Sequence, residues 1–281
     1  YESVFFLILM LFFVVYIPAV IIYDYNSVDV NNITFEKKEL SDGLNGFKIA
    51  LISDIQADRY TDDKRLKNFI EAVNKQNPDL ILIAGDVITS TPNYINKAAE
   101  YIGMLKAEYG IYSCVGDHDN WAYRQDTKRS IKEITEALGK YNVKMIGNSS
   151  ITIPVKDSNI EITFITNTYE QSIPKDTLYK LTQISSAEIK ILLTHQPKNE
   201  VIRAAEKNNY VLFLAGHTHG GQITLLFPFI QLTPTLVETT FIKGVRHYGN
   251  MLAIVTRGLG MSLAPIRYNS TPEIVTITFK K

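Results

Sequence analysis

Short apolar runs with strand-like composition alternate with longer amphipathic segments through most of the chain, and this alternation limits the fold to few classes. The runs at 47–53 and 80–84 predict buried strands, and helical spacing follows each of them, at 62–76 and 94–106. Alternation of this kind is typical of largely parallel sheets that are covered by helices. The same patterns predict further strands at 30–35, 111–115, 151–155, 160–166, 189–194, 211–215, 251–256 and 274–279, and further helices at 126–141, 175–181 and 199–208.

Ten strands are many for one open sheet, so we expect two packed sheets. The 281 residues suffice for one large domain and an appendage, and a content of 46 % hydrophobic and 21 % charged residues is ordinary for a globular chain. The predicted fold class is α/β, a four-layer sandwich in which helices flank two mixed sheets. We expect this domain at 47–281, after a linker and first strand at 27–46.

The N-terminal segment departs from this composition, because residues 4–23 contain no charged side chain. A helix of about 20 residues, at roughly 1.5 Å per residue, spans the hydrocarbon core of a bilayer, which is about 30 Å thick. A signal peptide would have a shorter apolar run and a small-x-small cleavage site, and a buried core helix is rarely apolar on every side. We therefore expect residues 1–26 to form a single-pass transmembrane anchor.

The charge distribution and the cysteine content of the chain bear on its orientation and its partners. The flanking charges assign no side of the membrane, because Lys37 and Lys38 come only after the acidic and neutral stretch at 24–32. The formal net charge is zero, so no nucleic-acid partner is expected. Cys114 is the only cysteine, which excludes an intramolecular disulfide and favours a small buried side chain in a strand. None of these features assigns an oligomeric state.

Residue types that bind metals follow the expected strands at the points where those strands end. His217 and His219 flank Thr218 in a loop bracketed by glycines. Two imidazoles two residues apart do not share a helix face, but a tight loop can present both of them to a metal. The motifs that precede them are Asp54-x-Gln56, Gly85-Asp86, Gly116-Asp117-His118-Asp119 and His195. Because ligands of α/β folds bind beyond the carboxyl ends of the strands, we expect these side chains to meet at one edge.

Each residue by itself has an ordinary structural explanation: Gly85-Asp86 as a turn, Asp54 as a helix cap and His195 as a core histidine. Three gathered carboxylates, however, would repel each other and shift their pKa values if no positive charge lay between them. Two divalent cations remove that cost, so the ordered set predicts a dimetal site.

The motifs D-x-Q, G-D, G-D-H-D, H and G-H-T-H, in this order, resemble those of the calcineurin-like metallophosphoesterases, whose usual pattern is D-x-H, G-D, G-N-H-E/D, H and G-H-x-H. The resemblance runs from about Phe47 to the C-terminus. The tail, G-H-T-H-G-G-Q followed by T-R-G-L-G-M-S-L-A-P-I-R and P-E-I-V, is similar to a subgroup of membrane-associated phosphodiesterases. Some members of that subgroup cleave UDP-2,3-diacylglucosamine, a pyrophosphate, in lipid A synthesis.

The resemblance implies a ligand set, residue by residue. The first metal is then held by Asp54, Gln56, Asp86 and His219. The second is held by Asp86 as a bridge, with Asp117, His195 and His217. Such a pair makes a metal-bound hydroxide near neutral pH and polarises a phosphoryl oxygen for attack in line. His118 is implied as general acid or charge stabiliser at the leaving group, with Asp119 orienting its ring.

Two residues depart from the family pattern. Gln56 stands where histidine is usual, and Asp117 stands where asparagine is usual. Both changes move the site toward oxygen ligands, which favours manganese, with magnesium, iron and zinc as the alternatives. The added negative charge of Asp117 is expected to blunt the Lewis acidity of the second metal.

Substrate contacts are expected from three arginines, because a guanidinium binds phosphate with two parallel hydrogen bonds. Arg124 follows His118 closely, and Arg257 and Arg267 flank a glycine-rich loop. An apolar run at 225–230 is expected either in the core or in contact with acyl chains or the bilayer surface.

The predicted function is metal-dependent hydrolysis of a phosphate ester or pyrophosphate, with a membrane-proximal or lipid-linked substrate. Two alternatives stay open. One is a metal-binding scaffold or sensor with weak turnover, which the two departures suggest. The other is a phosphodiesterase for soluble nucleotides whose anchor only localises it.

Overall fold

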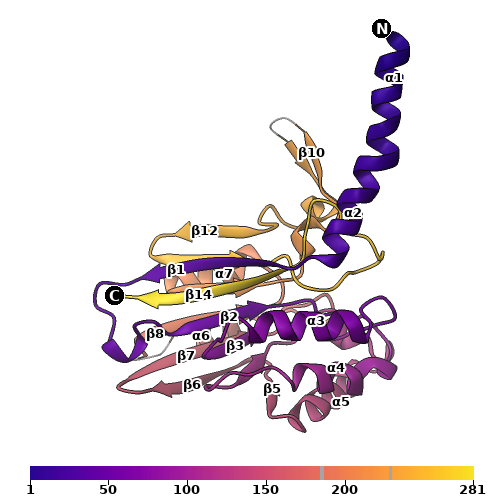
Figure 1. Ribbon diagram of the computed structural model, residues 1–281. Helices are drawn as coiled ribbons and strands as arrows, with labels where there is room; N and C mark the ends of the chain where they lie inside the picture. The colour runs from indigo at the N-terminus through magenta and orange to yellow at the C-terminus, as the bar shows by residue number, and fades with distance from the viewer. Residues whose placement is uncertain (184–186, 228–229) are drawn as a thin grey trace.

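The computed structural model describes residues 1–183, 187–227 and 230–281, which fold into the expected four-layer α/β sandwich with an N-terminal helix standing clear of it (Figure 1). Two six-stranded mixed sheets pack face to face, and each has helices on its outer face. The predicted fold class is therefore confirmed.

The first sheet has the strand order β1-β14-β2-β3-β4-β5. Its strands are β1 (Asp29–Glu36), β14 (Glu273–Lys280), β2 (Lys48–Ile52), β3 (Leu80–Ile83), β4 (Ile111–Ser113) and β5 (Val143–Met145). Neighbouring strands are parallel except for β14 and β2, which are antiparallel. β1 pairs with β14 along its whole length, so the first strand expected at 30–35 belongs to this sheet.

The second sheet has the strand order β12-β13-β9-β8-β7-β6. Its strands are β12 (Gly244–Tyr248), β13 (Met251–Val255), β9 (Leu212–Ala215), β8 (Ile189–Thr194), β7 (Ser158–Ile165) and β6 (Ser149–Val155). The four inner strands run parallel, and the two edge strands β12 and β6 are antiparallel to their neighbours.

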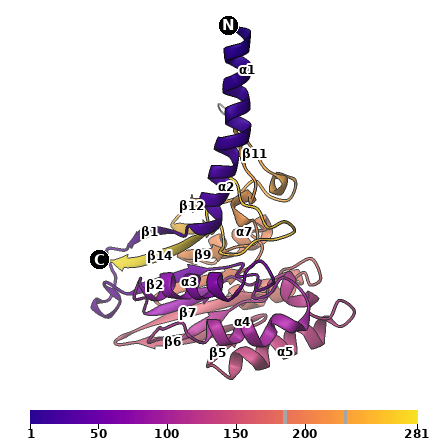
Figure 2. The ribbon, with the colours of Figure 1, turned by 45° about the vertical axis from the view of Figure 1, so that its right-hand side comes forward.

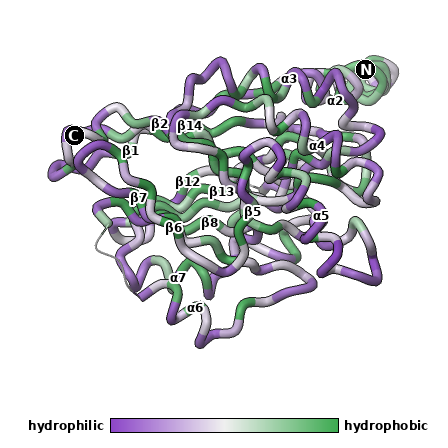
Figure 3. The backbone as a smooth tube through the Cα atoms, turned by 90° about the horizontal axis from the view of Figure 1, so that it is seen from below, coloured by the Kyte–Doolittle hydropathy of each residue, from purple (hydrophilic) through white to green (hydrophobic). Residues whose placement is uncertain are grey.

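Three apolar clusters hold the layers together. The central cluster lies between the sheets and includes Leu51, Leu82 and Ile191, none of which is accessible to solvent. The others lie under the helices of the two outer layers, which Figure 3 shows on opposite sides of the mostly hydrophobic strands. These helices are α3 (Asp63–Asn74), α4 (Ile95–Ile102) and α5 (Thr127–Gly139) on the first sheet, and α6 (Lys175–Thr182) and α7 (Asn199–Lys207) on the second.

The N-terminal helix runs from Glu2 to Asn26 as α1 (Glu2–Leu11), a π-helical stretch at Phe12–Tyr16 and α2 (Ile17–Asn26). Pro18 follows the π-helical stretch and lacks the N–H that a regular α-helix would need there. The helix is long and apolar enough to cross a bilayer, a test that a signal sequence also passes, and its side chains are largely exposed (Figures 1 and 2). It is thus a candidate membrane span.

A short hairpin, β10 (Leu225–Phe227) and β11 (Ile230–Leu232), projects beside this helix (Figures 1 and 2). It contains most of the apolar run at 225–230, of which residues 228–229 lie outside the described part of the chain. Leu225 and Leu226 are exposed, so these two residues do not belong to the core.

Candidate metal centre

The metal-binding residue types lie in loops that follow the carboxyl ends of strands from both sheets. Asp54, Asp86 and Asp117 follow β2, β3 and β4, whereas His195 and His217 follow β8 and β9. Five of the seven expected ligands, Asp54, Gln56, Asp86, His217 and His219, have positive φ angles between 49° and 72°. Non-glycine residues rarely adopt this conformation, and such strain tends to collect at functional sites.

These loops bring the side chains into two overlapping groups. The ligand atoms of Asp54, Asp86 and His195 lie within 4.8 Å of one another, and so do those of Asp117, His195 and His217. His195 Nε2 lies 3.3 Å from Asp86 Oδ2 and 3.3 Å from Asp117 Oδ2. His195, which belongs to both groups, therefore lies between them.

The remaining expected ligands border the same cluster. His217 Nδ1 lies 2.9 Å from Asp117 Oδ2, and His219 Nε2 lies 3.4 Å from Asp54 Oδ1. The Gln56 amide nitrogen donates to Asp86 Oδ2 at 2.9 Å. The structure thus brings all seven expected ligands together.

Unpaired polar atoms show that this donor set fits cations. His195 Nδ1 lies 2.6 Å from the carbonyl oxygen of Ala84, which can only accept, so Nδ1 holds a proton and Nε2 is the ring atom that a neutral His195 would offer to a metal. Asp54 Oδ1, Gln56 Oε1 and His195 Nε2 are buried and have no hydrogen-bond partner among the described residues. Buried oxygen and nitrogen lone pairs that point at one another are costly unless a cation lies between them.

The pKa values of the carboxyl groups also depend on burial and on nearby positive charge. Burial raises the pKa of Asp54 above its usual value. Burial also works to raise the pKa of Asp117, but the nearby imidazoles of His195 and His217 outweigh it and hold that pKa well below its usual value.

The two histidines of the glycine-bracketed loop are shifted in opposite directions. Burial lowers the pKa of His217, but Asp117 and Glu238 outweigh burial and raise it to about 9. Burial, together with the Arg267 guanidinium, lowers the pKa of His219 well below its usual value, which keeps that imidazole neutral and able to act as a ligand.

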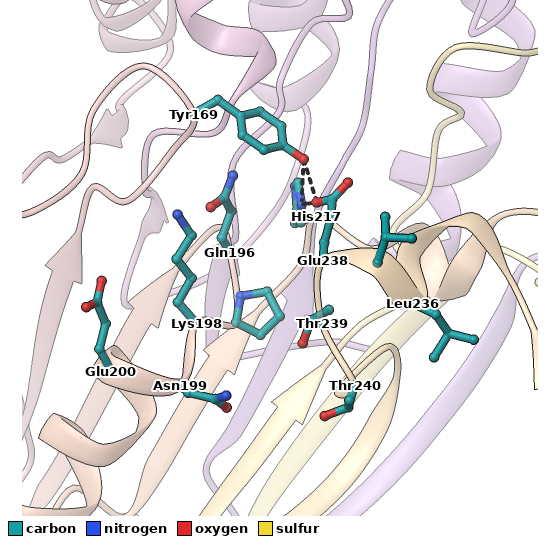
Figure 4. A pocket seen from close by; sticks show the side chains of 12 residues that line it. Tyr169, Gln196, Lys198, Asn199, Glu200, His217, Leu236, Glu238, Thr239 and Thr240 are labelled. Carbon is teal, nitrogen blue, oxygen red and sulfur yellow. Dashed lines mark hydrogen bonds and ion pairs between the residues drawn. The ribbon is translucent and has the colours of Figure 1, made fainter.

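Three residues that the sequence motifs do not contain support the ligands. Gln196 donates to both carboxylate oxygens of Asp117, at 2.9 and 2.8 Å, and the Tyr169 N–H donates to Asp117 at 2.6 Å. Glu238 Oε2 lies 2.8 Å from His217 Nε2 and accepts a 2.5 Å hydrogen bond from the Tyr169 hydroxyl (Figure 4). A carboxylate behind a ligating histidine fixes its ring and tautomer. The position of Gln196 directly after His195 is the one sequence signal that pointed to any of the three.

Asp119 does not orient the His118 ring, which corrects the role expected for it. Its carboxylate accepts the N–H groups of Asp86, Val87 and Gly116, at 3.1, 2.8 and 2.8 Å, and so ties two ligand loops together. Burial, with the nearby charge of Asp86, raises the pKa of Asp119 to about 6.

The His118 ring is oriented instead by a backbone carbonyl. Its Nδ1 lies 2.5 Å from the carbonyl oxygen of Thr89, and its Nε2 lies 3.1 Å from Ser262 Oγ. The carbonyl requires the proton on Nδ1, so Nε2 is the atom that can exchange a proton in the cavity.

Two cavities meet at the cluster. One, of about 440 Å³, is lined by Asp86, Asp117 and His118 together with Val237 and Leu263. The second, of about 620 Å³, lies on the far side of Tyr169, His217 and Glu238, which line both cavities (Figure 4). A phosphate ester can therefore reach the ligand cluster from solvent.

The three arginines have different environments. Arg124 lines a third cavity together with His118. Arg257 forms ion pairs with Asp29 and Glu273, at 2.9 and 3.1 Å. Arg267 is fully buried and donates to the carbonyl oxygens of Gly260, His219, Ser270 and Arg257. Arg267 is thus a structural residue rather than the expected substrate contact, because its donors are used by the backbone.

Comparisons with known proteins agree with this centre. The model of the family described as calcineurin-like phosphoesterase matches residues 47–221. The metallophosphoesterase YkuE of Bacillus subtilis is 30 % identical over 90 % of this chain and 86 % of its own length. A zebrafish (Danio rerio) transmembrane protein with metallophosphoesterase domain is 27 % identical over 87 % of this chain, which spans 55 % of that protein's length.

Solved structures agree on the fold. The NAD nucleotidase NadN of Haemophilus influenzae superposes with a TM-score of 0.51 at 14 % sequence identity, over 76 % of this chain and 45 % of its own. Since the family model covers more than half of the chain and YkuE aligns over nearly all of it, this chain belongs to the calcineurin-like phosphoesterase family of metal-dependent hydrolases.

Proposed function

We propose that this chain hydrolyses a phosphate ester or pyrophosphate that is lipid-linked or lies at a membrane surface. The observation that carries the proposal is the buried cluster of unpaired ligand atoms around His195, beside a cavity that Asp86, Asp117 and His217 line. When bound there, two divalent cations would supply the Lewis acidity that acidifies water and polarises a phosphoryl oxygen. Manganese is the proposed metal, because Gln56 offers an oxygen ligand where the family usually has a histidine nitrogen.

The proposed ligand sets share Asp86. The first consists of Asp54, Gln56, Asp86 and His219, and the second of Asp86, Asp117, His195 and His217. The short distances from His195 Nε2 to Asp86 and Asp117, and from His217 Nδ1 to Asp117, support the second set.

His118 is the proposed proton donor to the leaving group. Thr89 holds the proton on Nδ1, so a proton on Nε2 faces the cavity, where Ser262 Oγ occupies the place of an acceptor. Arg124 borders the neighbouring cavity that His118 also lines, and is proposed to bind the substrate's phosphate. Arg257 contributes less directly, because its two ion pairs occupy its guanidinium.

Residues 1–26 are the proposed single-pass anchor, and the folded unit that follows carries the site. The anchor places the cavity within reach of lipid headgroups, which supports a lipid-linked substrate over a freely soluble nucleotide.

The test is hydrolysis by the full chain in detergent with Mn²⁺, with an activated aryl phosphodiester, a soluble nucleotide pyrophosphate and a nucleotide-activated lipid as substrates. We expect metal-dependent turnover, and His118→Ala should lower kcat about 10²–10⁴-fold while metal binding is kept. His247→Ala is the matched control, because His247 is exposed on β12, and it should leave kcat unchanged. Stoichiometric metal without turnover on any substrate would favour the scaffold instead. Turnover of the nucleotide alone would refute the lipid-linked substrate.

A further inference from the structure

Exposed apolar side chains are concentrated beside the cavity of the candidate site. Residues 220–237 and 258–266 contain no charged side chain. Among the described residues of these two segments, seven large apolar side chains face solvent, and we call them the apolar rim: Leu225, Leu226, Leu232, Leu236, Val237, Leu263 and Ile266. A concentration of this kind is unusual on a surface that meets only water.

Two members of the rim are almost fully exposed to solvent, which is unfavourable for apolar side chains. Val237 is 90 % exposed, and Leu263 is 102 % exposed with a φ of 62°. A leucine in the left-handed region is strained, and full exposure forgoes any burial that would offset the strain. Both residues line the site cavity, so the rim is continuous with the entrance through which substrate passes.

The hairpin, which carries Leu225, Leu226 and Leu232 of the rim, is fixed to the same segment as the N-terminal helix. Asp24, which is buried near the end of α2, accepts from Ser270 N at 3.1 Å and from Thr271 Oγ1 at 2.6 Å. Directly before these residues, Tyr268 O accepts from Thr224 N at 2.8 Å, at the start of the hairpin. The helix and the hairpin therefore share one base, and they project in the same direction (Figures 1 and 2).

We propose that the apolar rim inserts into the interfacial layer of the bilayer that the helix spans. This inference rests on the anchor in the proposed function and deepens it, because it turns the mouth of the site cavity toward the lipid headgroups. The helix sets the direction of the bilayer normal, and a hairpin with the same base and direction reaches the same lipid leaflet. An interfacial element buries its apolar face about 5–10 Å below the headgroups, a depth suited to a hairpin of short strands.

Lipid is favoured over a protein partner as the occupant. Non-obligate protein interfaces have a polar rim around their apolar core. Residues 220–237 and 258–266, in contrast, contain no charged side chain. The rim also lies next to a candidate membrane span, so the bilayer around that helix can cover the rim without a further protein.

The experiment measures the depth of a fluorescent label in vesicles of phosphatidylcholine and phosphatidylglycerol that contain the full chain. Cys114 is completely buried, so a label on an added cysteine is selective. Leu226→Cys tests the hairpin and Val237→Cys tests the cavity mouth. Tyr179→Cys is the control, because Tyr179 is as exposed as Leu226, at 58 % against 57 %, and lies on α6, far from the N-terminal helix (Figures 1 and 3).

We expect the labels at 226 and 237 to be quenched by lipids that carry a nitroxide near the headgroup, several-fold more than the label at 179, and to be shielded from aqueous iodide. Equal quenching of all three labels by iodide would overturn the proposal. Shielding from both quenchers would also overturn it, because a protein surface would then cover the rim. The measurement needs no turnover, so lipid quenching in an inactive protein would refute the proposed function alone.

Discussion

At the scale of single residues, Gln56 distinguishes this centre most clearly from the usual pattern of its family. Its amide nitrogen donates to Asp86 at 2.9 Å, and its buried Oε1 has no partner in the described part of the chain. An amide oxygen is a harder ligand than an imidazole nitrogen, so this position biases the choice of metal.

Gln56→His should therefore shift the metal preference toward zinc. We expect the ratio of zinc to manganese affinity to rise about tenfold, which corresponds to about 1.4 kcal/mol. Competition titrations followed by calorimetry measure this ratio. Gln222→His is the control, because the Gln222 side chain hydrogen-bonds to the backbone of Ser262 and not to an expected ligand. An unchanged ratio in Gln56→His would show that residue 56 does not ligate.

His217 makes metal binding depend on pH. Its pKa of about 9 in the metal-free protein lies above the usual 6.5, because Asp117 and Glu238 outweigh burial. The stability that this ionised group contributes is complete below pH 6.5 and is lost as the pH rises through about 9. A metal needs the neutral imidazole, so binding at pH 7.5 should release a proton, and affinity should increase as the pH approaches 9. Calorimetry in buffers of different ionisation enthalpy detects the proton, and its absence would exclude His217 as a ligand.

The gathering of the expected ligands was predictable from their motifs, whereas the residues that contact them were not. The loops after five strands place all seven expected ligands in one cluster, as the order of motifs indicated. Tyr169 and Glu238 have no motif of their own and come from loops distant in sequence. Arg267 resembles a phosphate-binding residue in the sequence, but it points inward because backbone carbonyls lie within reach of its guanidinium.

At the scale of elements, the strands and helices with strong periodicity were predicted closely, whereas strands such as β5 and β12 were missed. Helix α3 was expected at 62–76 and lies at Asp63–Asn74, where Asp62 caps it by accepting from Arg65 N at 3.1 Å. Strand β5 has only three residues, and β12 is an exposed edge strand with a polar pattern. Short or edge strands depend on pairing with a neighbour, which leaves little signal in the sequence.

The join between α2 and the domain depends on one buried carboxylate. Asp24→Ala removes the acceptor of the Ser270 N–H and the Thr271 hydroxyl, both in the segment that also supports the hairpin. We expect a loss of about 1–3 kcal/mol in the free energy of unfolding, the cost of leaving buried donors unpaired. Denaturant unfolding in detergent measures the loss. Asp42→Ala, which removes an exposed ion pair with Lys281, should leave the free energy of unfolding nearly unchanged, because water screens such a pair. Equal effects of both variants would contradict the role of Asp24.

At the scale of the whole molecule, the centre joins the two sheets. Asp54, Asp86 and Asp117 extend from the first sheet, and His195 and His217 extend from the second. A cation bound between them links both sheets of the folded state, and the unfolded chain has no such preformed site.

Metal should therefore stabilise the whole domain. At a free metal concentration of about 100 times Kd, linkage predicts a gain of about 2.7 kcal/mol for each site. A thermal scan with and without chelator measures it as an increase in Tm with Mn²⁺. Asp86→Asn should reduce the increase, whereas Asp63→Asn, on the exposed start of α3, should keep it. A Tm that does not respond to metal would contradict a site shared by the two sheets.

The amino-acid sequence by itself determined the alternation of strands and helices, the apolar N-terminal segment and the order of the ligand motifs. These properties are local, because periodicity and strand ends depend on residues that are close together in the chain. Only the tertiary structure decided that Thr89 rather than Asp119 orients His118, that Arg267 is buried, and that the hairpin shares its base with the N-terminal helix. Such contacts join residues far apart in the chain, and they depend on loop paths and side-chain directions that no local pattern records.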